Sequence, residues 1–254
     1  MSVEYAPKGL IGLLTPQANT TVEPEYNILM PRGYAYINGR LMSDKKTIEA
    51  RLVDYFDTFE TACLQFANAP VKVIAAGCTG ASYLAGKDTE DRVLANIQDT
   101  RGVPAITGAS AVVDALREMG AKRIALASPY PDSLTAKSVV YWESRGFKVT
   151  RVASAPMDNT QFHPIYSMKA GAATALLYEL AADDTDAVVM LGTGMPTLGP
   201  MLEVNPNSKV PIISCMLCLG WKAVQLMDPV STSLESWIRG DHWRERFDMQ
   251  RPLA

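Results

Sequence analysis

IGLLTP at residues 11–16 and IALASP at residues 124–129 are two copies of one short pattern, an apolar run that a proline closes. Two further pairs of segments match each other in the same order along the chain: IAAGCTG (74–80) with VMLGTG (189–194), and GVPAITGAS (102–110) with KVPIISCML (209–217). Chance explains one such pair among short strands. Three ordered pairs at about the same spacing indicate an internal repeat, so the sequence predicts two copies of one unit.

Each copy alternates strand-like and helix-like segments. The expected strands are 8–16, 71–77, 103–107, 122–129, 186–192 and 209–214, and the expected helices are 47–69, 91–102, 109–120, 135–146, 170–184 and 217–227. Strands that are apolar throughout are typical of parallel sheets covered by helices on both faces. We therefore expect an α/β fold of two similar parallel-sheet lobes related by pseudo-twofold symmetry, the first formed by residues 1–115 and 219–254 and the second by residues 116–218.

Ligands bind such sheets beyond the carboxyl ends of the strands. The loops at these ends are TPQANTT (15–21), GCTG (77–80), SPYPDS (128–133), GTGMP (192–196) and SCMLC (214–218). Two lobes that face each other bring these loops around a common cleft, where we expect the active site.

Composition excludes several classes of protein. The formal net charge is −3 and the charges are dispersed, so no basic tract predicts binding to nucleic acid. No apolar run approaches the roughly 20 residues of a membrane helix, and the first residues lack the pattern of a signal peptide. Four cysteines in 254 residues make no disulfide framework, so we expect a cytoplasmic protein with reduced thiols. With only two histidines, a metal site is not expected; the oligomeric state stays open, a homo-oligomer included.

Cys78 directly follows an expected strand, in a loop of small residues rich in backbone N–H groups. Such a nest lowers the pKa of a thiol, so we predict a reactive thiolate; the alternative is a buried structural cysteine. Cys63 lies among aromatic residues of the helix 47–69 and is expected in the core. Cys215 and Cys218 are more simply explained by packing after the last strand than by a redox or zinc pair, although either thiol could border the cleft.

The motifs, in this order, resemble the aspartate/glutamate racemase superfamily, especially the branch with maleate cis-trans isomerase and arylmalonate decarboxylase. GLIGLLTPQANTTVEPE (9–25) is similar to the opening of maleate isomerases, GCTGAS (77–82) to their first cysteine loop and LGTGMPTL (191–198) to their second. The resemblance extends to about residue 227. It implies two similar lobes with a cleft between them, a small-molecule carboxylate as substrate, and no cofactor or metal.

The resemblance also implies roles for single residues. Cys78 is the expected catalytic residue, and Tyr130 occupies the place of a tyrosine that binds a substrate carboxylate. The other residues expected to bind substrate lie in the loops or, for Asn159, at an approximately matching position: Pro16, Asn19, Thr20, Thr79, Gly80, Asn159, Gly192, Thr193 and Gly194. Asn19 and Thr20 are equally expected to cap the start of a helix.

One departure from the family pattern concerns the second thiol. Two-base racemases and maleate isomerases carry a cysteine on each side of the cleft, but aligning Thr79-Gly80 with Thr193-Gly194 places Gly192 opposite Cys78. Arylmalonate decarboxylases also have one cysteine, in the second loop, with glycine in the first; this chain shows the reverse. We therefore do not expect two-base racemisation, unless Cys215 or Cys218 supplies the second base.

Three functions follow from these residues. In an isomerase, Cys78 adds to the double bond of a cis-enedioate such as maleate, the resulting single bond rotates, and the thiolate leaves. In a decarboxylase, a disubstituted malonate loses carbon dioxide and Cys78 protonates the enediolate. The loop Asn19-Thr20-Thr21 favours the isomerase, whereas the single cysteine favours the decarboxylase. The third function is a two-lobed carboxylate-binding protein without turnover.

Overall fold

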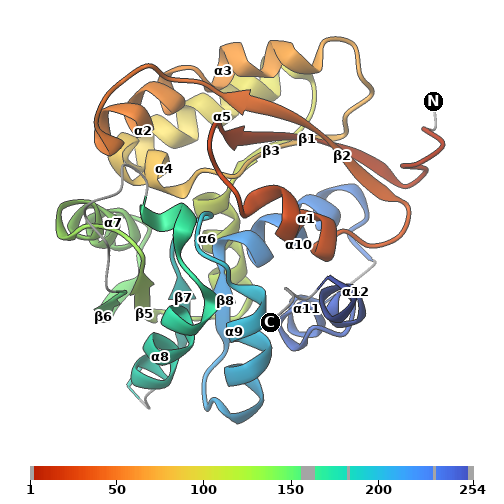
Figure 1. Cartoon of the computed structure of the whole chain (residues 1–254). Coiled ribbons are helices and arrows are strands. Elements are labelled where there is room, and N and C mark those ends of the chain that lie inside the picture. The colour runs from red at the N-terminus through yellow and green to blue at the C-terminus, as the bar shows by residue number, and fades with distance from the viewer. Residues whose placement is uncertain (1–2, 156–163, 182–183, 231–232, 251–254) are drawn as a thin grey trace.

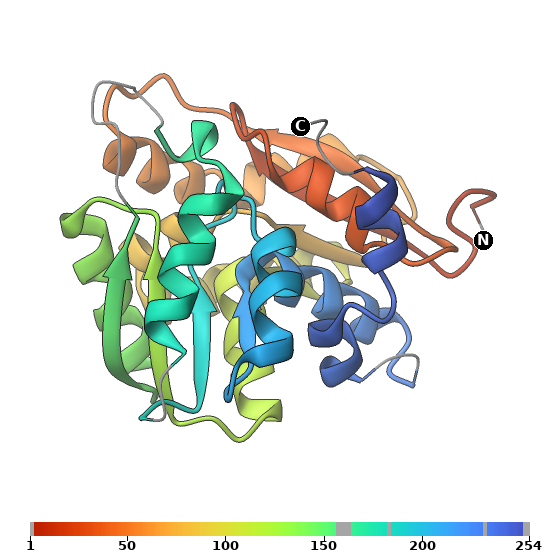
Figure 2. The ribbon, with the colours of Figure 1, turned by 60° about the horizontal axis from the view of Figure 1, so that its bottom comes forward.

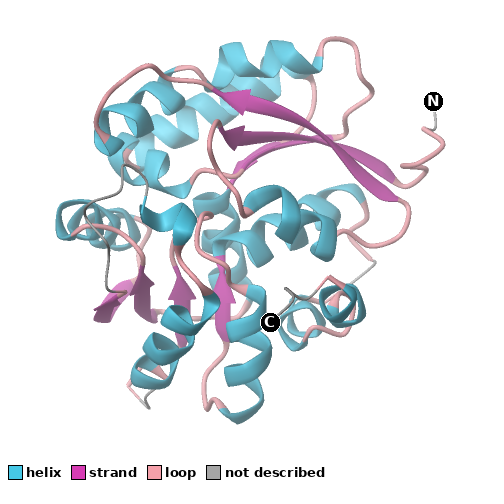
Figure 3. Cartoon of the chain, in the orientation of Figure 1, coloured by secondary structure: helices cyan, strands magenta, loops and turns pink. Residues whose placement is uncertain are grey.

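Two four-stranded parallel sheets form the framework of the protein (Figure 1; strands in magenta in Figure 3). The computed structural model describes residues 3–155, 164–181, 184–230 and 233–250. The first sheet runs in the order β2 (Tyr34–Leu41), β1 (Gly9–Pro16), β3 (Val73–Ala76), β4 (Ala105–Thr107), and the second in the order β6 (Lys148–Ser154), β5 (Arg123–Ser128), β7 (Ala187–Met190), β8 (Ile212–Ser214). Because β1 and β5 hold the same place in the same strand order, the predicted fold of two similar lobes is confirmed.

The strand register extends this equivalence to the strand-end loops. Ile11 of β1 pairs with Val73, and Ile124 of β5 pairs with Ala187. Cys78 lies five residues after Val73, and Gly192 lies five residues after Ala187. The structure therefore places Gly192 at the position in the second lobe that Cys78 occupies in the first.

Helices flank both sheets. Those that precede β5 are α1 (Val22–Leu29), α2 (Ile48–Asp57), α3 (Phe59–Ala62), α4 (Thr79–Ala85), α5 (Lys87–Arg101) and α6 (Gly108–Glu118). Those that follow it are α7 (Asp132–Ser144), α8 (Ala170–Leu180), α9 (Leu198–Val204), α10 (Cys215–Met227), α11 (Leu234–Arg239) and α12 (Arg244–Met249). Among the described residues, no helix combines the length and the apolar character that crossing a membrane requires.

The structure differs from the sequence expectation in two respects. The helix expected over 47–69 is broken at Thr58, whose hydroxyl donates to the carbonyl oxygen of Asp54 and competes with regular helix continuation. The strands β2 and β6 were not predicted. Both are edge strands, and most of their residues are half-buried or exposed, so their sequences lack the continuous apolar character of the central strands.

The chain returns to the first lobe after β8. Helix α10 packs mainly against α6, and also against α1 and β3. Figure 2 shows α12 (dark blue) beside α1 (orange-red), in agreement with their contacts. These contacts concern packing only, and the expected lobe boundaries stay a prediction.

A buried carboxylate links the lobes on one side of the cleft. Glu25 of α1 accepts hydrogen bonds from the hydroxyl of Thr197 at 2.8 Å and from the backbone N–H groups of Thr197 and Leu198, at the start of α9. Burial raises the pKa of the Glu25 carboxyl to about 7, although these donors favour its ionised form. Glu25 therefore combines an inter-lobe contact with a charge whose burial is unfavourable.

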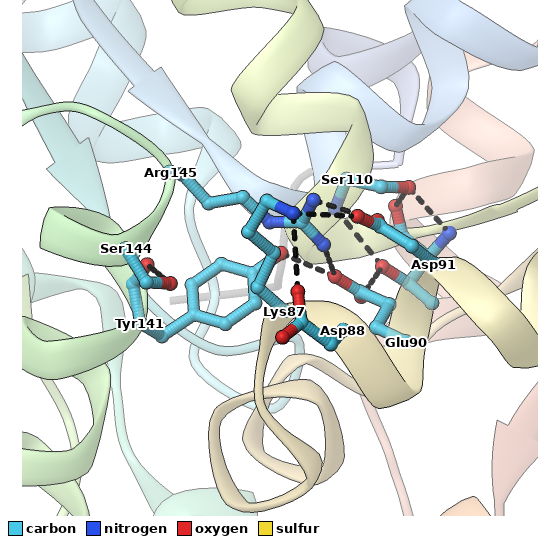
Figure 4. A network of polar contacts seen from close by, with 9 residues as sticks. Lys87, Asp88, Glu90, Asp91, Ser110, Tyr141, Ser144 and Arg145 are labelled. Atoms are coloured by element: carbon cyan, nitrogen blue, oxygen red, sulfur yellow. Dashed lines mark hydrogen bonds and ion pairs between the residues drawn. The ribbon is translucent and has the colours of Figure 1, made fainter.

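A second buried carboxylate links the lobes through an ion network (Figure 4). Glu90 of α5 is fully buried and accepts hydrogen bonds from Arg145 and Tyr141 of α7, and from Thr107 at 2.6 Å. Arg145 also pairs with Asp91 at 2.6 Å. Removing one partner of such a network leaves an unpaired buried charge, which typically destabilises a fold by about 3–5 kcal/mol.

The raised pKa of Glu25 predicts pH-dependent stability. The ordinary value is 4.5 and the folded-state pKa is about 7, so the folded protein binds more protons than the unfolded chain between these values. The contribution of Glu25 to the free energy of unfolding is therefore largest below pH 4.5. It decreases by up to about 3 kcal/mol as the pH rises through 7. In Glu25→Gln this dependence disappears. Urea unfolding from pH 4.5 to 8.5 measures the free energy of unfolding of each protein. The difference between wild type and Glu25→Gln should change with pH, whereas the difference between wild type and the exposed control Glu245→Gln should stay constant. Parallel curves for wild type and Glu25→Gln would contradict this account.

Candidate active site

A cavity lies at the carboxyl ends of the strands, with lining residues from both lobes. It offers about 40 Å³ to the centres of water-sized molecules. Eight of the residues predicted for the site line it: Pro16, Asn19, Cys78, Thr79, Gly80, Tyr130, Thr193 and Gly194. The parallel sheets explain this convergence, because each of these residues ends a strand or follows one. Their roles toward a substrate stay a prediction.

Cys78 precedes the first turn of α4 and is 2% exposed. Burial raises the pKa of its thiol to about 12, although the backbone N–H of Ala81 donates to the sulfur and favours the thiolate. The prediction of a lowered pKa is therefore wrong. The expected N–H group is present, but the loss of water around the sulfur outweighs it. Cys78 is therefore a neutral thiol near pH 7.

The loops of the two lobes are hydrogen-bonded to each other across the cavity. The hydroxyl of Thr193 donates to the carbonyl oxygen of Gly77 at 2.7 Å, directly before Cys78. In the other direction, the side-chain amide of Asn19 donates to the carbonyl oxygen of Thr193 at 3.2 Å, and the hydroxyl of Thr21 donates to that of Gly194 at 2.7 Å. These three bonds join the strand-end loops into one wall around the thiol.

Asn19 also caps a helix, as the sequence indicated. Its side-chain oxygen accepts from the backbone N–H groups of Thr21 and Val22, at 2.8 and 2.9 Å, where α1 begins. Thr20 differs from the expectation: it is exposed, does not line the cavity, and donates its hydroxyl to the carbonyl oxygen of Tyr166. Asn159 lies outside the described residues.

Tyr130 places its hydroxyl 3.1 Å from the hydroxyl of Thr79. The ring is buried, and burial raises the pKa of its phenol well above the usual range, even though the bond with Thr79 lowers it. The phenol is therefore neutral at physiological pH and can donate a hydrogen bond to an anion in the cavity.

Gly192 is buried with φ +83°, in the region that favours glycine, and is not among the lining residues. A Cβ atom there would lie 3.0 Å from the Tyr130 hydroxyl and 3.1 Å from a side-chain carbon of Pro129. The tyrosine thus occupies the space that a thiol at this position would need. Introducing a second catalytic thiol by Gly192→Cys would therefore require both a strained backbone and displacement of Tyr130.

The remaining three cysteines do not line the cavity. Cys215 and Cys218 belong to the first turn of α10 and are fully buried. Cys215 lies directly behind the cavity wall, where its thiol hydrogen-bonds the side chain of Thr79 and the backbone of Gly192. Cys63 is buried beside Phe59 and Phe66, in the hydrophobic cluster of the first lobe that also contains Cys78. All four cysteines are free of disulfide bonds. Among the described residues, Cys78 is the one cysteine that lines the cavity. In the same residues, no cluster of three His, Cys, Asp or Glu side chains could hold a metal ion.

Sequence reasoning missed one wall of the cavity, which α2 supplies. Ile48, Arg51, Leu52 and Tyr55 line it from one face of this helix, at spacings of three and four residues. The turn Pro164–Ser167 of the second lobe contributes further lining residues. Helical spacing in the sequence predicts this face of α2, but which element it packs against is a tertiary property.

Comparisons with known proteins place these features in context. The family model described as arylmalonate decarboxylase matches residues 11–236. A maleate isomerase of Nocardia farcinica is 28% identical over 86% of this chain and 90% of its own length, and one of Geobacillus stearothermophilus is 24% identical over 86% and 91%. A solved structure of the Nocardia farcinica maleate cis-trans isomerase, with one cysteine replaced by serine and a covalently bound succinylcysteine intermediate, superposes with a TM-score of 0.77 at 25% identity, covering 87% of this chain and 93% of that one.

The bond from Thr193 to Gly77 predicts a stability effect. Thr193→Val keeps the shape of the side chain but leaves a buried carbonyl oxygen without its donor, so the free energy of unfolding should fall by about 1–3 kcal/mol. Urea denaturation measures it. The control is Thr61→Val, at an exposed position of α3. Equal stability of the two variants would show that the bond does not hold the loops together.

Proposed function

Since the chain belongs to the arylmalonate decarboxylase family, we propose that it is a cofactor-independent enzyme in which Cys78 acts on a small dicarboxylate, most like a maleate cis-trans isomerase. The observation that carries the proposal is the position of Cys78. It is the one thiol facing the cavity among the described residues, on the first-lobe loop, beside hydroxyl and amide donors. Two of the curated relatives that align over most of their length are maleate isomerases.

The covalent intermediate of the related isomerase supports a one-thiol mechanism. In that protein one cysteine is replaced by serine, so the succinylated sulfur belongs to another cysteine. A succinyl group on sulfur is the product of adding a thiol across the double bond of a four-carbon enedioate. A second thiol is therefore not required for the covalent step in that protein, and we propose the same step on Cys78 for this chain.

The reaction balances with Cys78 alone once its thiol has released its proton to solvent. The sulfur lone pair forms a C–S bond to one alkene carbon, and the π electrons move into the adjacent carboxylate as an enediolate. The former double bond rotates; the electrons then return, the C–S bond breaks, and the thiolate is released with the trans product. The neutral phenol of Tyr130 and the amide of Asn19 line the cavity and can donate hydrogen bonds to the enediolate.

An arylmalonate decarboxylase activity is the second candidate. The description of the family model and the single thiol favour it, since decarboxylation needs only one proton donor. For the location we propose the cytoplasm, which four free thiols support, and we propose no partner other than the small-molecule substrate.

Turnover of maleate tests the proposal. Wild-type protein should convert maleate to fumarate, as followed by proton NMR. Cys78→Ser should lower the rate by at least about a thousandfold, because a serine hydroxyl is a much weaker nucleophile than a cysteine thiol near neutral pH. Cys63→Ser changes a buried cysteine that does not line the cavity, and this variant should keep the wild-type rate. Decarboxylation of an arylmalonate without maleate turnover would establish the second candidate. Carboxylate binding without any product would establish a non-catalytic protein.

The raised thiol pKa predicts the pH profile. Only the thiolate attacks, and below a pKa of about 12 its fraction grows tenfold for each pH unit. We therefore expect kcat/KM for maleate to rise about tenfold per unit between pH 6.5 and 9. A plateau that begins below pH 8 would mean that the substrate-free thiol has a pKa much lower than its burial indicates.

A further inference from the structure

Arg51 is the one charged side chain among the described residues that line the cavity. It projects from the face of α2 that also carries Ile48 and Leu52, and Ile165 of the second lobe lines the same cavity. No described Asp or Glu lines it. The described lining residues thus give the cavity a positive charge beside apolar side chains, which favours an anion.

The guanidinium of Arg51 is held in place. Its Nε donates to the carbonyl oxygen of Lys45 at 2.6 Å, and it hydrogen-bonds the phenol of Tyr55, which lines the cavity one helical turn away. Burial raises the pKa of the phenol of Tyr166, another lining residue, and the nearby charge of Arg51 opposes this rise. Arg51 is half-buried, and it lines the same cavity as the thiol of Cys78. An arginine fixed in this way presents its planar group with little loss of side-chain freedom when a carboxylate arrives.

We propose that Arg51 binds the second carboxylate of the substrate and thereby selects dicarboxylates over monocarboxylates. The proposal rests on the proposed function, in which the first carboxylate lies at the end of the cavity formed by Cys78 and Tyr130. During thiol addition, the electrons of the double bond move into one carboxylate only, and the other stays ionised throughout. Arg51 therefore binds ground state and transition state about equally, so its loss raises KM and leaves kcat nearly unchanged.

The same charge disfavours the alternative reaction. Decarboxylation requires a carboxylate to lose its negative charge, and a guanidinium bound to that carboxylate stabilises the reactant more than the transition state. Removing Arg51 should therefore lower kcat/KM for decarboxylation of an arylmalonate by a smaller factor than kcat/KM for maleate. The kinetic effect of Arg51 on the two substrate classes separates the two chemistries.

The test compares maleate with its half-amide, maleamate, which has one carboxylate fewer and nearly the same shape. Wild type should prefer maleate by about a hundredfold in kcat/KM. Arg51→Gln should raise KM for maleate about 30- to 100-fold, keep kcat within about threefold, and reduce the preference to a few-fold. Arg51→Lys, which keeps the charge without the planar fork, should fall between them. Arg92→Gln, at an exposed position of α5, is the matched control and should behave as wild type.

Binding of succinate, which cannot react, provides a readout independent of turnover. Calorimetry should show at least about a thirtyfold weaker Kd for Arg51→Gln than for wild type, with thermal unfolding verifying that the variant is folded. If wild type binds succinate but turns over no cis-enedioate, and Arg51→Gln no longer binds succinate, the isomerase proposal fails and the role of Arg51 stands. If Arg51→Gln binds succinate as wild type does, or keeps the preference for maleate over maleamate, the inference is wrong.

Discussion

The hydrogen bond from the hydroxyl of Thr193 to the carbonyl oxygen of Gly77 is the contact on which the site depends. It joins the loop after β7 to the residue directly before Cys78. Two buried carboxylates, Glu25 and Glu90, also link the lobes. The strand-end loops cover Cys78, which is 2% exposed.

Exclusion of water has a chemical consequence. A buried thiol with one N–H donor remains protonated, so the site does not store a reactive thiolate. Tyr130 is likewise kept neutral and stands where a second thiol would project from Gly192. The site thus has a thiol from the first lobe and a neutral phenol from the second, an asymmetric arrangement within a symmetric framework. This asymmetry fits addition to a double bond and does not fit two-base racemisation.

The repeat made much of the fold predictable. Apolar runs that end at proline or glycine predicted the central strands, and parallel topology then placed Pro16, Cys78, Tyr130 and Thr193 at one edge. The edge strands β2 and β6 were missed because partial exposure gives them mixed sequences. The wall formed by α2 was missed because helical periodicity shows a face without showing its partner. The pKa of Cys78 was predicted in the wrong direction because the local sequence displays the N–H donors but not the burial.

The most direct test of the central claim is to trap the covalent intermediate. Protein mixed with maleate is quenched in acid during turnover, digested, and mapped by mass spectrometry. We predict an adduct with the mass of one maleate on the peptide that contains Cys78, and none on peptides with Cys63, Cys215 or Cys218, which lie outside the cavity. Turnover without any adduct under conditions of rapid quenching, or an adduct on another cysteine that disappears as product forms, would contradict the assignment of Cys78 as the nucleophile.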